Sequence, residues 1–133
     1  HLRPLIMSTL KVNTIQDASG GNSLTPANVK QGIAKVWINY SQSNGTTRDS
    51  FNVSSFTDNE DGVSTVNFSI TMPNDDYCVC GSTAQGETTI ADADVICFRS
   101  YTTTSVVVET FGSQANRNVE TDHPLNNVVV FGD

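Results

Sequence analysis

Basic residues are scarce in this chain of 133 residues. Seven lysines and arginines face fourteen aspartates and glutamates, which leaves a net charge of −7 at pH 7. Such an acidic surface repels the phosphates of nucleic acid and the anionic lipids of a membrane. No stretch approaches the roughly 20 apolar residues that span a bilayer, and the N-terminus lacks an apolar signal segment of about 7 to 15 residues. We therefore expect a soluble chain, not secreted through a signal of its own, that binds neither nucleic acid nor membrane.

Cysteine and histidine are also scarce. Cys78, Cys80 and Cys97 are the only cysteines, and three is an odd number, too small for a disulfide scaffold. Cys78 and Cys80 point the same way from any strand that contains them, not at each other. As zinc ligands they lack a convincing fourth partner, because His1 and His123 are the only histidines. We predict three reduced cysteines buried in the core, where free cysteine acts as a small hydrophobe, and no cofactor.

Strong helix formers are few, and the composition favours strands. Leucine, alanine, glutamate and lysine are sparse, whereas serine, threonine, asparagine, valine and glycine are abundant. Residues 33–40 alternate between two faces. The face expected to point into the core carries Ala34, Val36, Ile38 and Tyr40. The opposite face carries Lys35, Trp37 and Asn39.

Further strands and turns follow along the chain. We expect Phe51 and Val53 to share a face of one strand. Turn residues at 58–62, 73–76 and 102–104 separate strands, and 83–93 and 112–124 read as long loops. The expected strands after the first are 50–57, 63–72, 77–82, 95–101, 105–111 and 127–131. About seven strands joined mostly by turns predict an all-β fold, an antiparallel β-sandwich.

The N-terminal residues do not fit this meander. Leu10, Val12 and Ile15 form a short apolar run that breaks at glycines 20 and 21. A single helical turn follows at 27–31, with Thr25 as its N-cap, proline at its first position and Gly32 as its end. We expect residues 7–24 to be an extended arm for attachment or oligomerisation by β-augmentation. Residues 25–133 would form the sandwich domain, and residues 1–6 an upstream or cloning-derived extension.

Three segments carry a resemblance to a known family. They are STLKVNTIQDASGGNSL, QGIAKVWINY and RDSFNVSSFTDNEDGVSTVNFSITMPNDDYCV. In this order they resemble structural proteins of marine bacteriophages, in particular tail-fibre or appendage proteins of cyanophages and pelagiphages. The resemblance implies a virion component of small β-domains, often trimeric, attached by one end. Family members tend to start at the position of Met7, carry smaller residues at Glu60 and Asp61, and share little of the pattern beyond residue 82.

The sequence offers few candidate catalytic residues. His123 lies beside Asp122 and Pro124 in a polar loop, and no G-x-S-x-G motif surrounds any serine. We interpret His123 as a solvated loop or interface residue and the protein as not an enzyme. The carboxylates at 58–61, 75–76 and 92–94 fall in turns, where turn chemistry explains them.

Two further groups of residues have more than one interpretation. Asp58, Glu60 and Asp61 are a weak calcium candidate, because hard cations bind carboxylates, but they lack the EF-hand spacing. A plain hairpin turn explains them as well. Trp37 either belongs to the core or packs at an attachment or subunit interface, where aromatic residues are enriched.

These observations leave two main hypotheses. The first is a tail-fibre module that contacts a host cell-surface glycan or protein. The resemblance implies that such a module is a homotrimer. Its receptor-facing residues would be Gln85, Glu87, Asn116, Arg117 and His123. The second is a capsid head-fibre, decoration or adaptor protein that binds only other virion subunits. A glycan-depolymerising tailspike fragment is a third, weaker alternative. Each places the chain in a virion that is assembled in the host cytoplasm.

Overall fold

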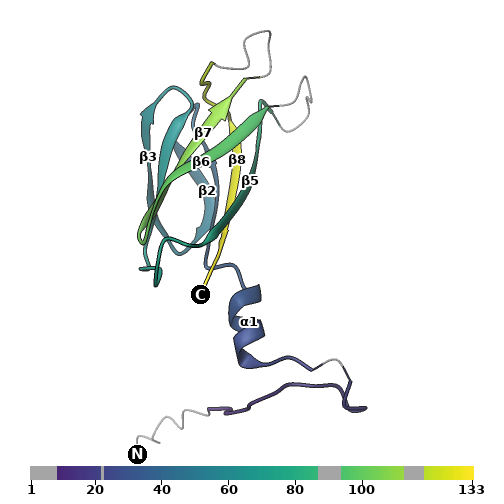
Figure 1. Ribbon diagram of the computed structural model, residues 1–133. Coiled ribbons are helices and arrows are strands. Elements are labelled where there is room, and N and C mark those ends of the chain that lie inside the picture. The colour runs from purple at the N-terminus through teal and green to yellow at the C-terminus, as the bar shows by residue number, and fades with distance from the viewer. Residues whose placement is uncertain (1–8, 22, 87–93, 113–118) are drawn as a thin grey trace, which may run out of the picture. The chain divides into compact units, whose positions relative to one another are not determined.

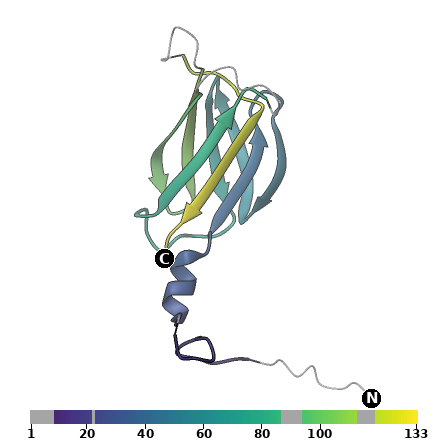
Figure 2. The same cartoon turned by 90° about the vertical axis from the view of Figure 1, so that its right-hand side faces the viewer.

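The computed structural model describes residues 9–21, 23–86, 94–112 and 119–133. Its contacts divide the chain into two compact units, the first ending at Gly32 and the second beginning at Ile33. Among the described residues, the second unit has eight strands in two four-stranded sheets that pack face to face (Figure 1, Figure 2). The strands are β1 (Val36–Ser41), β2 (Thr46–Phe51), β3 (Val53–Glu60), β4 (Val63–Phe68), β5 (Cys78–Ala84), β6 (Val95–Thr102), β7 (Ser105–Phe111) and β8 (Leu125–Phe131). The predicted all-β sandwich is confirmed.

The two sheets have the strand orders β2-β1-β8-β5 and β3-β4-β7-β6, and all neighbouring strands are antiparallel. The single strand predicted at 50–57 is wrong, because the chain passes from one sheet to the other at Asn52. Asn52 has a φ of 56°, a left-handed conformation that asparagine tolerates better than most residues. Its side chain donates a 2.7 Å hydrogen bond to the carbonyl of Lys35. As a result Phe51 is half exposed on an outer face, while Val53 packs against the core.

The core lies between the sheets and consists of side chains on alternating positions. Three of the residues predicted to face the core on β1 are buried. The strand predicted at 63–72 is shorter, because β4 ends at Phe68. The buried apolar residues of this cluster are Val36, Ile38, Tyr40, Val66, Phe68, Met72, Tyr77, Val106, Val108, Val128 and Val130. The rings of Tyr40 and Phe56 lie 4.9 Å apart, and those of Phe68 and Tyr77 lie 5.8 Å apart.

All three cysteines are exposed, so the prediction of buried core cysteines is wrong. On β5 the inward positions belong to Val79 and Gly81, which leaves Cys78 and Cys80 on the outer face. A Cβ atom at Gly81 would lie 2.9 Å from the ring of Phe98 in the opposite sheet. The inner face therefore needs glycine at this position.

The first unit contains the helix α1 (Pro26–Gly32) among its described residues. The backbone N–H of Asn28 donates a 3.2 Å hydrogen bond to Thr25 Oγ1, so the predicted helical turn and its N-cap are confirmed. No helix in the described parts of the chain has the length and apolar character needed to cross a membrane.

Candidate attachment site

The arm before α1 folds back on itself. Ile15 and Leu24 form an antiparallel bridge, with N–H to carbonyl distances of 2.8 and 2.6 Å. Asp17 closes the turn between them, because its Oδ1 accepts hydrogen bonds from the N–H groups of Ser19 and Gly21 at 3.1 and 2.9 Å. The backbone of Ile15 thus has a partner within the arm.

The apolar side chains of this arm remain exposed among the described residues. Leu10, Val12 and Ile15 keep 83%, 38% and 52% of their surface exposed. Among the described residues of this unit none is buried, and only Val29 is half-buried. Roughly two dozen residues without a core cannot offset their loss of chain entropy. The unit therefore presents apolar surface that a partner can cover.

An open groove runs between the arm and α1. It has a volume of about 590 Å³ and is lined by Leu10, Lys11, Val12, Asn13, Ile15, Pro26 and Val29. The chain bends at Asn13, and this bend puts Ile15 on the same groove as Leu10 and Val12, although strict alternation would separate them. The sequence pattern found the three apolar residues but not the groove they line.

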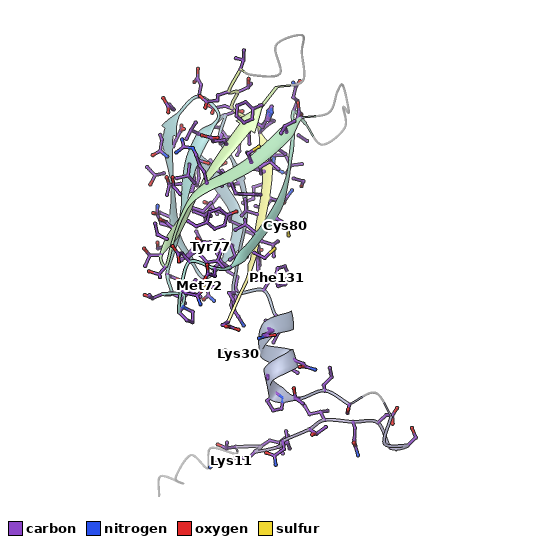
Figure 3. The ribbon with its side chains drawn as sticks, in the orientation of Figure 1. Lys11, Lys30, Met72, Tyr77, Cys80 and Phe131 are labelled. Atoms are coloured by element: carbon purple, nitrogen blue, oxygen red, sulfur yellow. The ribbon has the colours of Figure 1, made fainter. Side chains whose placement is uncertain are left out.

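Trp37 lies outside the buried core, on the outer face of the sheet β2-β1-β8-β5. Strand pairing puts it between Phe51 and Val129, with Cys80 next in the same row. Cys80 and Phe131 are labelled in Figure 3, which also shows Met72 and Tyr77 of the core. We call this surface the outer apolar patch, and its residues are Trp37, Phe51, Cys78, Cys80, Val129 and Phe131.

The outer face of the other sheet carries polar side chains on β3 and β4. Asn67 donates hydrogen bonds from Nδ2 to Ser55 Oγ and Thr57 Oγ1 at 3.2 and 3.1 Å. Asn59 Nδ2 donates to Thr65 Oγ1 at 2.8 Å. These bonds pair the polar side chains of β3 and β4, whereas β6 and β7 add Val95, Val107 and Phe111 to the same face.

His123 is fully buried, so its predicted place in a solvated, receptor-facing loop is wrong. It belongs to a polar network around Gln42, which is itself buried at the end of β1. Gln42 Oε1 accepts hydrogen bonds from Thr110 Oγ1 at 2.9 Å and from the N–H of His123 at 3.4 Å, and Gln42 Nε2 donates to Ser64 Oγ at 3.3 Å. The hydroxyl of Ser64 also shares a 2.8 Å bond with the phenol of Tyr40. The network ties strands of both sheets together.

Burial sets the electrostatics of this network. It lowers the pKa of the His123 imidazole, and the carboxylates of Asp94 and Asp122 offset part of that shift. His123 Nε2 lies 3.8 Å from Asp94 Oδ1, and His123 Nδ1 has no hydrogen-bond partner in the described part of the chain. Burial also raises the pKa of Tyr40 to about 12, against the opposing effect of its bond to Ser64. These contacts hold the fold together.

The calcium candidates lie at an exposed hairpin turn. Partial desolvation and the neighbouring carboxylates of Asp122 and Asp61 raise the pKa of Asp58. Asp122 Oδ1 is engaged by the backbone N–H of Gly62 at 2.7 Å. Glu60 is exposed at the end of β3. Within the described ranges, no group of three or more His, Cys, Asp or Glu side chains is arranged to hold a metal ion.

Of the other receptor candidates, Gln85 is the one that the described part of the chain contains. Gln85 is exposed just after β5. Glu87, Asn116 and Arg117 lie outside the described residues.

Comparisons with protein-family models, with curated proteins and with solved structures each find no match. The fold defines the class, a small β-sandwich with a separate N-terminal arm.

Proposed function

We propose that this chain is a non-enzymatic structural protein of a bacteriophage virion, a tail-fibre or appendage module held in place by its N-terminal arm. The observation that carries the proposal is the arm itself. Leu10, Val12 and Ile15 are exposed on one groove, while the sandwich has a complete core without them. Exposed apolar surface of this kind is typical of a segment that binds another protein.

The sequence resemblance supports the same function. Its first segment covers the arm, and its second includes β1 with Trp37. The third runs through β2, β3, β4 and the start of β5. The shared pattern therefore spans both the exposed arm and half of the sandwich, as expected for a module that assembles through its N-terminal part.

A capsid head-fibre, decoration or adaptor protein is the second candidate. The observation that favours it is the size of the sandwich, since the described residues contain no long shaft or coiled coil that would extend away from the particle. Such a protein would use the same arm but would bind only other virion subunits.

Two measurements test these candidates. Mass spectrometry of purified phage particles should detect the chain at a fixed copy number, and its absence from particles would contradict both. The isolated protein should bind host cells and compete with phage adsorption if it is a tail-fibre module. Incorporation into particles without host binding would favour the capsid protein.

A further inference from the structure

The outer apolar patch is the second exposed apolar surface of this chain. Phe51, Trp37, Val129 and Cys80 form one row across the sheet β2-β1-β8-β5, because directly paired residues of antiparallel strands point to the same side. Phe51 keeps 49% of its surface exposed. Clustered apolar side chains on an outer sheet face mark an interaction surface.

We propose that the outer apolar patch binds the N-terminal arm of a second copy of this chain. The opposite net charges of the arm and the sandwich favour this partner. Residues 7–32 hold two basic residues and one acidic residue, a net +1, whereas residues 33–133 hold four basic and thirteen acidic residues, a net −9. Arg3, in the extension expected at residues 1–6, completes the −7 of the chain. Two sandwiches therefore repel each other, and an arm and a sandwich attract.

The dimensions of the two surfaces agree. Leu10 to Ile15 spans at most about 17 Å, and a row across four strands spans about 14 Å. The bend at Asn13 shortens this segment and keeps Ile15 on the same groove as Leu10 and Val12. The apolar side chains of the arm lie on one groove and remain exposed among the described residues of their unit. An arm laid across the row would cover Trp37 and Cys80 while burying its own apolar residues.

This inference rests on the proposed function, in which the arm is an attachment segment, and it names the partner of that segment. The test uses two variants of the full chain. The arm-serine variant carries Leu10→Ser, Val12→Ser and Ile15→Ser. The control arm variant changes polar, exposed arm positions instead, with Thr9→Ser, Thr14→Ser and Gln16→Ser. Neither variant alters the net charge.

Trp37 is the only tryptophan, so its fluorescence reports on the patch alone. We expect acrylamide to quench Trp37 less in the wild type and in the control arm variant than in the arm-serine variant. The protection should disappear on dilution, together with the oligomer seen by light scattering, because the arm comes from a second copy.

The cysteines supply an independent readout with an internal control. Cys80 lies in the patch, whereas Cys97 is exposed on β6 in the other sheet. In the assembled wild type, maleimide should label Cys80 at least about tenfold more slowly than Cys97, since protection reflects the small fraction of open patch. In the arm-serine variant the two rates should become similar.

Two results would overturn the inference. Protection of Trp37 in a monomer, unchanged by dilution, would mean that the patch is covered without a second copy. A monomeric wild type with Trp37 and Cys80 fully accessible would mean that the arm binds no patch of this chain. In that second case, loss of the arm-serine variant from virions would still support the proposed function, so the two failures are distinguishable.

Discussion

Replacing the apolar residues of the arm should separate attachment from folding. Leu10, Val12 and Ile15 expose 83%, 38% and 52% of their surface, somewhat less than two whole side chains together. Since full burial of such a side chain contributes about 1.5 to 3 kcal/mol, covering this surface on a partner contributes roughly 3 to 5 kcal/mol. At about 1.4 kcal/mol per factor of ten, the arm-serine variant should bind its partner about 100-fold to several thousand-fold more weakly.

The same three substitutions should not alter the stability of the sandwich. Every residue of the buried core lies at position 36 or later, and the division between the two units falls after Gly32. The free energy of unfolding of the sandwich should therefore change by less than about 0.5 kcal/mol, as for surface substitutions in general. Urea denaturation followed by circular dichroism measures this quantity.

The functional assay is the copy number of the chain in purified phage particles, measured by quantitative mass spectrometry. The arm-serine variant should be depleted, and the control arm variant should be incorporated like the wild type. Unfolding of the arm-serine variant would refute the reasoning, because it would show that the arm belongs to the core of the sandwich. Normal incorporation would refute it as well, by placing attachment elsewhere.

Three further predictions concern the sandwich. Gln42→Leu should lower the free energy of unfolding by about 1 to 3 kcal/mol in urea denaturation, because the N–H of His123 loses its acceptor in a buried site; an unchanged midpoint would contradict the network. Burial lowers the pKa of His123 below its ordinary 6.5, so the folded state binds fewer protons than the unfolded state. The free energy of unfolding should therefore be highest above about pH 6.5 and should fall as the pH drops toward the pKa of the folded state. His123→Gln should flatten that decline between pH 7.5 and 5.5. An equal decline in both proteins would show that the His123 imidazole does not cause it. Gly62→Ala should destabilise the fold more than Gly45→Ala, because both have positive φ but only at Gly62 would a Cβ lie 2.4 Å from a backbone nitrogen; equal melting temperatures would argue against that close approach.

The alternation of apolar residues predicted much of the sandwich. Val36, Ile38 and Tyr40 face the core as their spacing indicates, because a half-buried strand imposes a period of two on its sequence. Gln42 continues the same period, and that position is the signal that could have identified it as buried. The side chain obscures this signal, because glutamine is rarely buried without partners, and the partners of Gln42 lie far along the chain.

The failures have a common physical cause. Their own chemistry predicts cysteine inside and histidine outside, whereas the pairing of β5 with β8 puts Cys80 on the outer face and the polar network around Gln42 includes a buried His123. The crossing at Asn52 divides an apparently continuous strand through a single backbone angle, which leaves no mark in the apolar pattern. The outer apolar patch was equally hidden, because Trp37 and Phe51 become neighbours only when β1 pairs with β2.

The central claim is that this chain is a virion protein held by its N-terminal arm. Cryo-electron microscopy of the phage particle that carries it tests the claim most directly. The account predicts a β-sandwich of this topology on the tail or capsid, with residues 9–24 buried against a neighbouring subunit. A sandwich attached through another surface, with the arm free in solvent, would contradict it.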